Sequence, residues 1–163
     1  MFSDIHMKIT FLWMGKTTER WLQEGIDEYA KRLKHYVSLS IEVVPTPKNM
    51  PKQDVAKQKE MEGDAMFACI APTDEVYLLD ERGMAYSSES LASFLQKRMS
   101  ASVKHLVLVT GGPFGFSEKL YQRANGLISF SQLTFSHQMI RLLVCEQIYR
   151  AFTILRGESY HHP

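Results

Sequence analysis

The sequence predicts an α/β fold with a mostly parallel sheet and helices on both of its faces. Two observations carry this prediction. Short apolar runs alternate along the chain with longer stretches of helical periodicity. The 163 residues, 45% of them hydrophobic and 23% charged, suit one globular domain with one sizeable core. We expect residues 1–6 to be an extension and residues 7–163 to form this single domain.

Five short segments are predicted as strands, and they are 7–14, 40–44, 75–80, 106–110 and 127–129. The fourth is apolar enough to be central in a sheet that is covered on both faces. Pro45 and Pro47 end the second strand, because proline cannot continue a sheet ladder. Residues 81–84 are expected to turn the chain after the third strand.

Five longer segments carry helical periodicity, and they are 19–33, 54–70, 89–99, 118–124 and 138–156. Hydroxyl side chains are available to cap three of them, namely Thr17 or Thr18, Ser87 or Ser88, and Ser117. We expect inward apolar stripes on the first two helices, formed by Trp21, Leu22, Ile26, Tyr29 and Leu33, and by Val55, Met61, Ala65, Met66 and Ala68. The last helix has the strongest pattern.

Composition and charge argue against several classes of protein. A net charge of +1 gives no sign of binding to naked nucleic acid by charge alone. No apolar run approaches the roughly 18 residues that span a bilayer, and residues 1–6 do not resemble a signal peptide, so we expect a cytoplasmic protein without a membrane partner. Cys69 and Cys145 lack metal-ligand spacing and are expected to be buried, reduced thiols. We expect no metal at His161 and His162.

Two loops follow predicted strands at positions where α/β proteins bind ligands. Residues 111–115 (Gly-Gly-Pro-Phe-Gly) allow backbone to approach a ligand closely, although such a turn is structural about as often. Residues 130–135 are partly apolar after a strand too short to bury them. Their backbone groups need partners, which a bound heterocycle would provide, and the alternative is a tight crossover packed into the core.

Polar side chains also gather on the last helix and on the tail that follows it. His137 can be a simple cap, and Arg141 lies one turn further on. Glu146 precedes Arg150 by four residues, so a purely structural ion pair is one interpretation of Arg150. Tyr160 and His161 at a chain end are normally solvated, but after Gly157 they can also fold back over a site.

Taken together, these motifs resemble one family, the RlmH methyltransferases of the SPOUT class, over residues 7–161. The residues that carry the resemblance are Gly111-Gly112-Pro113-x-Gly115, Leu133-Thr134-Phe135-x-His137, Arg141, Glu146-Gln147-x-Tyr149-Arg150-Ala151 and Tyr160-His161. The resemblance implies a C-terminal trefoil knot and a homodimer with its site at the subunit interface. It also implies S-adenosylmethionine as cofactor, and as substrate a pseudouridine of the helix 69 loop of 23S rRNA, methylated at N3.

The resemblance also implies roles for individual residues. The cofactor would be held by Leu79, Gly111, Phe130, Ser131, Gln132, Leu133, Thr134 and Phe135. The catalytic candidates are His161 as proton acceptor, Tyr160 as a stacking or hydrogen-bonding group, and Arg150 as a partner for the developing oxyanion of the base. His137 and Arg141 would contact RNA or support the site from behind.

Weak overall charge suits a substrate that is presented by an assembled ribosome. Two other function classes stay open on the sequence. One is an RNA-binding or assembly module without transfer activity, or a methyltransferase of another RNA such as tRNA. The other is a small hydrolase, for which Asp80-Glu81 after the third strand is the only candidate carboxylate cluster and is more typical of a turn.

Overall fold

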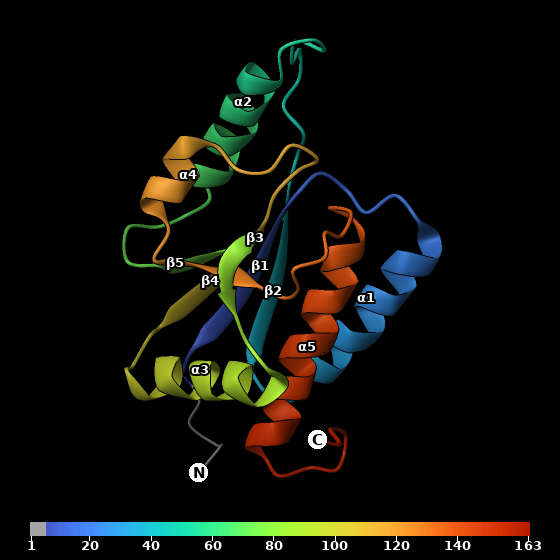
Figure 1. The fold of residues 1–163 in the computed structure, drawn as a ribbon, viewed down its shortest axis with the longest axis vertical. Helices are drawn as coiled ribbons and strands as arrows, with labels where there is room; N and C mark the ends of the chain where they lie inside the picture. Colours follow the sequence, from blue (N-terminus) through green and yellow to red (C-terminus); the bar gives the residue numbers. More distant parts are fainter. Residues whose placement is uncertain (1–5) are drawn as a thin grey trace.

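The protein is a three-layer α/β structure with a five-stranded parallel sheet at its centre (Figure 1). This architecture comes from a computed structural model that describes residues 6–163, so most of the predicted N-terminal extension lies outside the described residues. The sheet order is β2-β1-β4-β3-β5, and each neighbouring pair is parallel. The strands are β1 (Lys8–Met14), β2 (Ser38–Val44), β3 (Glu75–Ala85), β4 (His105–Thr110) and β5 (Gly126–Ser129).

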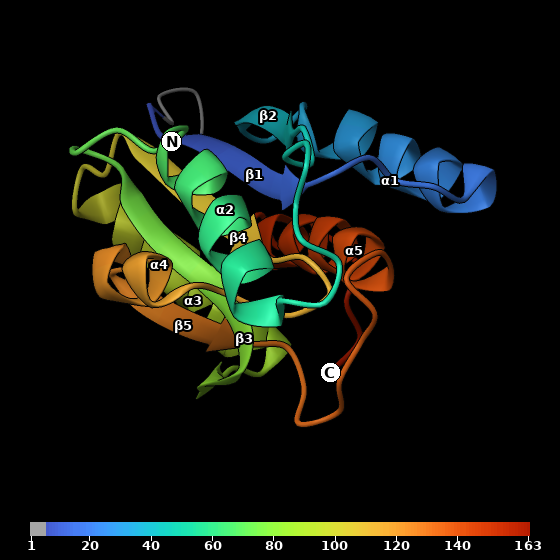
Figure 2. The same ribbon diagram turned by 90° about the horizontal axis from the view of Figure 1, so that it is seen from above.

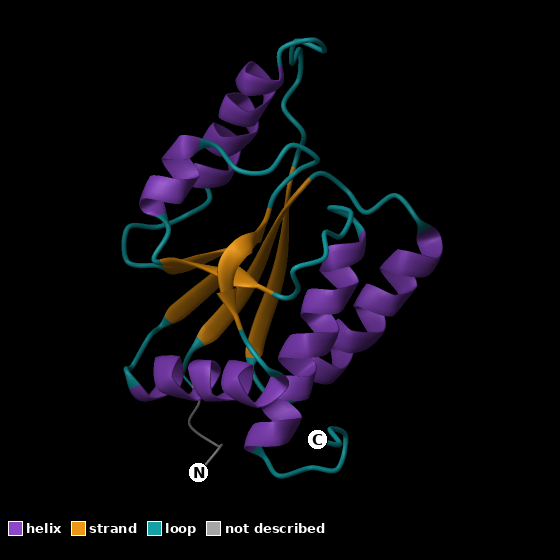
Figure 3. Cartoon of the chain, viewed as in Figure 1, coloured by secondary structure: helices purple, strands orange, loops and turns teal. Residues whose placement is uncertain are grey.

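Within residues 6–163, five helices alternate with these strands and cover both faces of the sheet, as the order of apolar runs and helical segments predicts (Figure 3). They are α1 (Arg20–Leu33), α2 (Val55–Phe67), α3 (Ser88–Ser100), α4 (Glu118–Arg123) and α5 (Met139–Leu155). Helices α1 and α3 both contact α5 on one face, and α2 contacts α4 on the other. The predicted caps Ser87 and Ser117 accept hydrogen bonds from the backbone at Ser90 and Leu120. The predicted threonine caps are wrong, because α1 begins after Glu19 without a side-chain cap.

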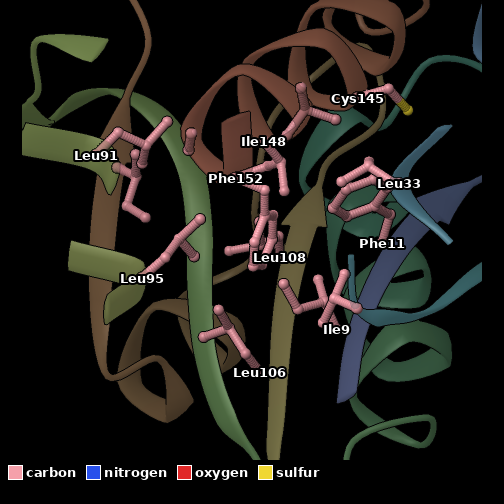
Figure 4. Close-up of a cluster of buried hydrophobic side chains, with 14 of the residues drawn as sticks. Ile9, Phe11, Leu33, Leu91, Leu95, Leu106, Leu108, Cys145, Ile148 and Phe152 are labelled. Atoms are coloured by element: carbon pink, nitrogen blue, oxygen red, sulfur yellow. The ribbon is translucent and has the colours of Figure 1, made fainter. Parts of the chain in front are cut away.

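The central strands β1 and β4 are buried on both faces, and each face of the sheet has its own apolar core. Along β1, Ile9, Phe11 and Trp13 belong to the core under α1, α3 and α5 (Figure 4), whereas Leu12 and Met14 belong to the core under α2 and α4. This alternation follows from the two-residue repeat of a strand. It explains why the strands of a parallel sheet read as continuous apolar runs.

The third strand is longer than predicted. Residues 81–84 do not end it, because β3 continues to Ala85 with a register shift between Leu79 and Met84 in its pairing with β5. A Cβ atom at Gly83 would lie 2.5 Å from the backbone carbon of Leu127, so only glycine allows the two strands to pass this closely. A glycine that sequence reasoning assigned to a turn is therefore a contact point between strands.

Several burial predictions are also wrong. Trp21 is 57% exposed and Val55 is 45% exposed, so neither faces the sheet. On α2 the deeply buried residues include Glu62 and Gly63, where a Cβ at Gly63 would lie 2.1 Å from Ser117 Oγ. Cys69 is exposed, whereas Cys145 is buried, and both are free thiols. Close packing of α2 against the start of α4 decides the buried side of α2, and periodicity does not show it.

Within residues 6–163 no helix is long and apolar enough to cross a membrane. No group of His, Cys, Asp and Glu side chains in the same part of the chain could hold a metal ion.

Candidate active site

A pocket of about 910 Å³ opens where β4 and β5 end, beside the middle of β3. Three chain segments form most of its wall, namely residues 79–82, the glycine loop 110–116, and the loop 130–137. The carboxyl ends of parallel strands are the usual ligand-binding edge of such a sheet. Seven of the predicted cofactor residues line the pocket, and these are Leu79, Gly111, Phe130, Ser131, Leu133, Thr134 and Phe135. Gln132 is the one predicted residue that does not.

Two glycines of the glycine loop have little or no room for a side chain. A Cβ atom at Gly111 would lie 3.1 Å from Phe116 Cε1, and one at Gly112 would lie 2.6 Å from Glu62 Oε2. Gly115 has a positive φ of 83° and its N–H donates to the Gly112 carbonyl at 3.2 Å. Glycine is therefore required at these positions of the pocket wall, and a chain without side chains there lets a ligand approach closely.

The loop 130–137 projects from the body of the protein (Figure 2) and is held by its own serines. The Ser129 hydroxyl donates to the Ser131 carbonyl at 2.8 Å, and Ser131 Oγ accepts from the Leu133 N–H at 2.9 Å. Leu133 is 73% exposed and Phe135 is 42% exposed. The alternative of a crossover packed into the core is therefore wrong for these two side chains, and apolar surface is left at the rim of the pocket.

The pocket fits a cofactor of the size and chemistry that the resemblance implies. Its volume lies within the roughly 300–1,000 Å³ range of small-molecule sites. Among the described residues, the buried Thr110 Oγ1 has no hydrogen-bond partner, and Thr110 lines the pocket. Buried polar atoms are normally satisfied, so an unpartnered oxygen at a pocket wall marks a place where a ligand can bind. Sequence reasoning missed Thr110, whose only signal is its position at the end of β4.

A hydrogen-bonded group of Asp80, Arg82 and Tyr121 forms one side of the pocket. Asp80 accepts hydrogen bonds from the backbone N–H of Arg82 at 2.9 Å, from Arg82 Nε at 3.2 Å, and from the hydroxyl of Tyr121. Burial of Asp80 raises its pKa, but these hydrogen bonds outweigh it and hold the pKa at about 2. With its oxygens engaged in this way, Asp80 is poorly placed as the nucleophile of a hydrolase, and it ties the extension of β3 to α4.

A second group of side chains, which we call the tail cluster, lies between the second half of α5, the tail and the start of α3, and begins at the middle of α5. It consists of Glu146 and Arg150 of α5, Tyr160 and His161 of the tail, and Glu89 of α3. Arg150 Nη2 donates to Glu146 Oε1 at 2.5 Å, and Arg150 Nη1 lies 3.3 Å from His161 Nδ1. The Tyr160 hydroxyl donates to Glu146 Oε1 at 3.0 Å, and His161 Nε2 lies 2.9 Å from Glu89 Oε1. The structure thus brings the three predicted catalytic residues together.

The contacts of the tail cluster show what surrounds Arg150 and the tail. The ion pair of Glu146 and Arg150 is present, but Arg150 also reaches His161 and lies over the Tyr160 ring, 4.8 Å from its centroid. Tyr160 and His161 are both partly buried, whereas the tail residues on either side of them are exposed. Burial, and hydrogen bonds with Tyr29 and Glu146, raise the pKa of Tyr160, so its phenol stays protonated at neutral pH and acts as a donor. Sequence reasoning missed Glu89, because nothing in the chain links α3 to the tail.

The two residues predicted to contact RNA have different surroundings. His137 lines the pocket, and its pKa is lowered by burial and by the charge of Arg141, which favours the neutral ring. Arg141 is fully buried, so a direct RNA contact is wrong in this conformation. It donates to the Met14 carbonyl at 2.6 Å and to Thr17 Oγ1 at 3.0 Å. Burial lowers its pKa to about 10, and its hydrogen bonds hold the end of β1 against α5.

Comparison with known proteins agrees with this geometry. A family model described as a predicted SPOUT methyltransferase matches residues 7–161. The chain is 47% identical over 156 residues to a protein of Flavobacterium johnsoniae named ribosomal RNA large subunit methyltransferase H. The aligned residues make up 96% of this chain and 99% of the relative. The chain belongs to the RlmH family of SPOUT methyltransferases. Proteins of the same name from Flavobacterium psychrophilum and Parabacteroides distasonis are also 47% identical over the same shares.

In this member of the RlmH family, the pocket and the tail cluster lie apart within one chain. None of the tail-cluster residues lines the pocket. Ile140 lines it, and Arg150 follows ten residues later on α5, which corresponds to about 15 Å of helix. Figure 1 shows α5 leading away from the loop that precedes it toward the tail at its other end.

Proposed function

We propose that this protein transfers a methyl group from S-adenosylmethionine to N3 of a pseudouridine in the helix 69 loop of 23S rRNA. The observation that carries the proposal is the pocket at the carboxyl edge of the sheet, in a chain of the RlmH family. The names of the relatives support rRNA of the large subunit as substrate. The choice of nucleotide rests on the resemblance alone.

The cofactor would lie between three segments, with Leu79, Gly111 and residues 130–135 as its contacts, Gln132 included, and with Thr110 Oγ1 as an added polar partner. When bound, S-adenosylmethionine supplies the methyl group on a sulfonium sulfur. The chain therefore has to orient the cofactor and the RNA base and to exclude water from them. Correct orientation of the two reactants alone can lower a barrier by roughly 7–11 kcal/mol. We propose that the loop 130–137 and α5 belong to a C-terminal trefoil knot of the SPOUT type, which would hold this loop rigid.

The tail cluster supplies the groups that suit the RNA base. His161 would accept the proton from the ring nitrogen, because a neutral imidazole offers a lone pair on one of its two nitrogens. Tyr160, with its protonated phenol, would stack on the base or donate a hydrogen bond to it. Arg150 would stabilise the negative charge that develops on the base oxygen. His137 at the pocket rim would contact RNA near the cofactor.

A homodimer would bring these two parts together. Reacting atoms must lie about 3–3.5 Å apart, and one chain holds its tail cluster far from its own pocket. We propose that the tail of one subunit completes the pocket of its partner. The apolar surface of Leu133 and Phe135 at the pocket rim supports an interface there, since such patches are normally covered.

The chain gives little electrostatic attraction to naked RNA, with a net charge of +1. We propose that recognition depends on the assembled ribosome in the cytoplasm. The test is transfer of labelled methyl to ribosomes from cells that lack this gene, with free rRNA and small subunits as controls. Label on large-subunit rRNA within intact ribosomes is expected, and mapping identifies the nucleotide. Equal labelling of free rRNA contradicts the dependence on the ribosome, and labelling of tRNA alone contradicts the substrate.

A further inference from the structure

We propose that Glu89 is a positioning residue that holds the proton of neutral His161 on Nε2 and so leaves Nδ1 as the nitrogen that accepts the substrate proton. The assignment of the tautomer stands on the contacts within this chain. Only the last step, in which the proton comes from the RNA base, rests on the proposed function.

The imidazole of His161 lies between two charged groups of opposite sign. Its Nε2 is 2.9 Å from Glu89 Oε1, and its Nδ1 is 3.3 Å from Arg150 Nη1. Arg150 is itself held in place by Glu146 and by the face of Tyr160. Each ring nitrogen therefore has one partner, and the partners come from α3 and α5.

The chemistry of the two partners assigns the proton. A guanidinium has only N–H donors, so the nitrogen that faces Arg150 must offer a lone pair. An ionised carboxylate only accepts, so the nitrogen that faces Glu89 must carry the hydrogen. Glu89 lies in the first turn of α3, where the helix dipole favours a negative charge, and its hydrogen bond with His161 lowers its pKa further. Neutral His161 is therefore the Nε2–H tautomer.

This tautomer determines how the ring can act as a base. When Nδ1 takes the proton from the ring nitrogen of the substrate, the electron pair of that N–H bond stays on the substrate. The imidazolium then has donors on both nitrogens, and Glu89 opposes the new charge at Nε2. Arg150 loses its acceptor at Nδ1 and is free to turn its N–H groups toward the base oxygen. Without Glu89, the proton can move to Nδ1, and that nitrogen can no longer accept one.

A merely structural role for Glu89 is disfavoured by its exposure. Its side chain is 54% exposed, and exposed ion pairs contribute little to stability. The tail has other anchors, since the Tyr36 hydroxyl donates to Glu158 Oε2 at 2.6 Å and the Glu158 N–H donates to the Thr153 carbonyl at 2.9 Å. Glu158 therefore provides a matched control on the same tail, three residues from His161.

The test measures the tautomer directly. Protein labelled with ¹⁵N in its six histidines is studied by long-range ¹H–¹⁵N correlation NMR, and His161→Gln identifies the signals of His161. The wild type is expected to show the Nε2–H tautomer. Glu89→Ala is expected to give a mixture, Glu89→Gln to keep most of the Nε2–H form because its amide oxygen still accepts, and Glu158→Ala to match the wild type.

Methyl transfer is measured on the same variants. In a serine protease triad, a carboxylate that fixes a histidine tautomer contributes about 10⁴-fold to kcat. The pair of Glu89 and His161 is half-exposed, so we expect turnover to fall by only about tenfold in Glu89→Ala, with unchanged cofactor affinity. An Nδ1–H tautomer in the wild type, or an unchanged tautomer in Glu89→Ala, overturns the inference. A tautomer that follows Glu89 in a protein that methylates no RNA supports the assignment and instead overturns the proposed function.

Discussion

The pocket and the tail cluster are built in opposite ways. The pocket wall is largely backbone and small or apolar side chains, with glycines at the points where a Cβ would clash. The tail cluster is a network of charged and aromatic side chains drawn from three parts of the chain. The pocket is a cavity that still needs a ligand, whereas the hydrogen bonds of the tail cluster are already made.

This difference indicates that the pocket and the tail cluster have different roles in the proposed reaction. Bare backbone suits a cofactor that brings its own reactive group and needs only to be held. A network of titratable groups suits the handling of a proton and of developing charge on a substrate base. If this division holds, changes in the tail cluster should affect turnover without affecting cofactor affinity, and changes in the pocket should affect both.

The largest expected effect comes from Arg150. Arg150→Lys cannot contact Glu146 and His161 together while stacking on Tyr160, because lysine lacks the planar fork of donors. We expect methyl transfer to fall by about 10²–10³-fold, as when one oxyanion donor is removed. Isothermal titration with S-adenosylmethionine should give an unchanged Kd. A parallel loss of cofactor affinity would mean that the two regions are not separate.

Mixed dimers test whether the two regions meet across subunits. Arg150→Ala damages the tail cluster, and Gly83→Ala damages the pocket. If each site combines one pocket with the partner's tail, half of the dimers in an equal mixture are mixed, and each has one intact site. We expect the mixed dimers to contribute about a quarter of the wild-type methyl transfer, so that the mixture exceeds the mean of the two variants measured alone. Methyl transfer that stays at the level of the separate variants would contradict a site shared between subunits.

A substitution at Gly83 tests whether the close approach of β3 and β5 beside the pocket is needed for cofactor binding. A Cβ at this position would lie 2.5 Å from the backbone of Leu127, so Gly83→Ala forces β3 and β5 apart. We expect the free energy of unfolding to fall by about 2–3 kcal/mol, in the range for overpacking, together with weaker cofactor binding. Urea denaturation and calorimetric titration measure the two effects. Met84→Ala, at a neighbouring side chain that is 64% exposed, is the matched control and should change neither.

The smallest expected effect concerns Asp80, one of the charged residues in the pocket wall. Because its pKa of about 2 lies below the ordinary value, ionised Asp80 stabilises the folded state above about pH 4, and this contribution is lost as the pH falls toward 2. Asp80→Asn should therefore lower the free energy of unfolding by about 1–2 kcal/mol at pH 7, allowing for the exposed Arg82. Denaturant melts of both proteins should converge between pH 4 and pH 2. A constant difference across that range would contradict the role of the charge.

The order and type of the elements could be read from the sequence because they depend on local patterns. The apolar runs of β1 and β4 and the hydroxyl caps at Ser87 and Ser117 are local features, and the structure confirms them. The errors lie where distant contacts outweigh local preference. Gly83 lies in a strand because β5 passes against it, and Glu62 and Gly63 are buried because α4 packs on α2.

For the site, the sequence determined the motifs, and their resemblance to one family pointed to both the pocket loops and the tail residues. What only the tertiary structure decided is which side chains meet. It buried Arg141 behind the site, exposed Leu133 at the pocket rim, and placed Glu89 of α3 against His161 of the tail, 72 residues away in the chain. Such pairings depend on how helices pack over the sheet, and a one-dimensional pattern does not contain that information.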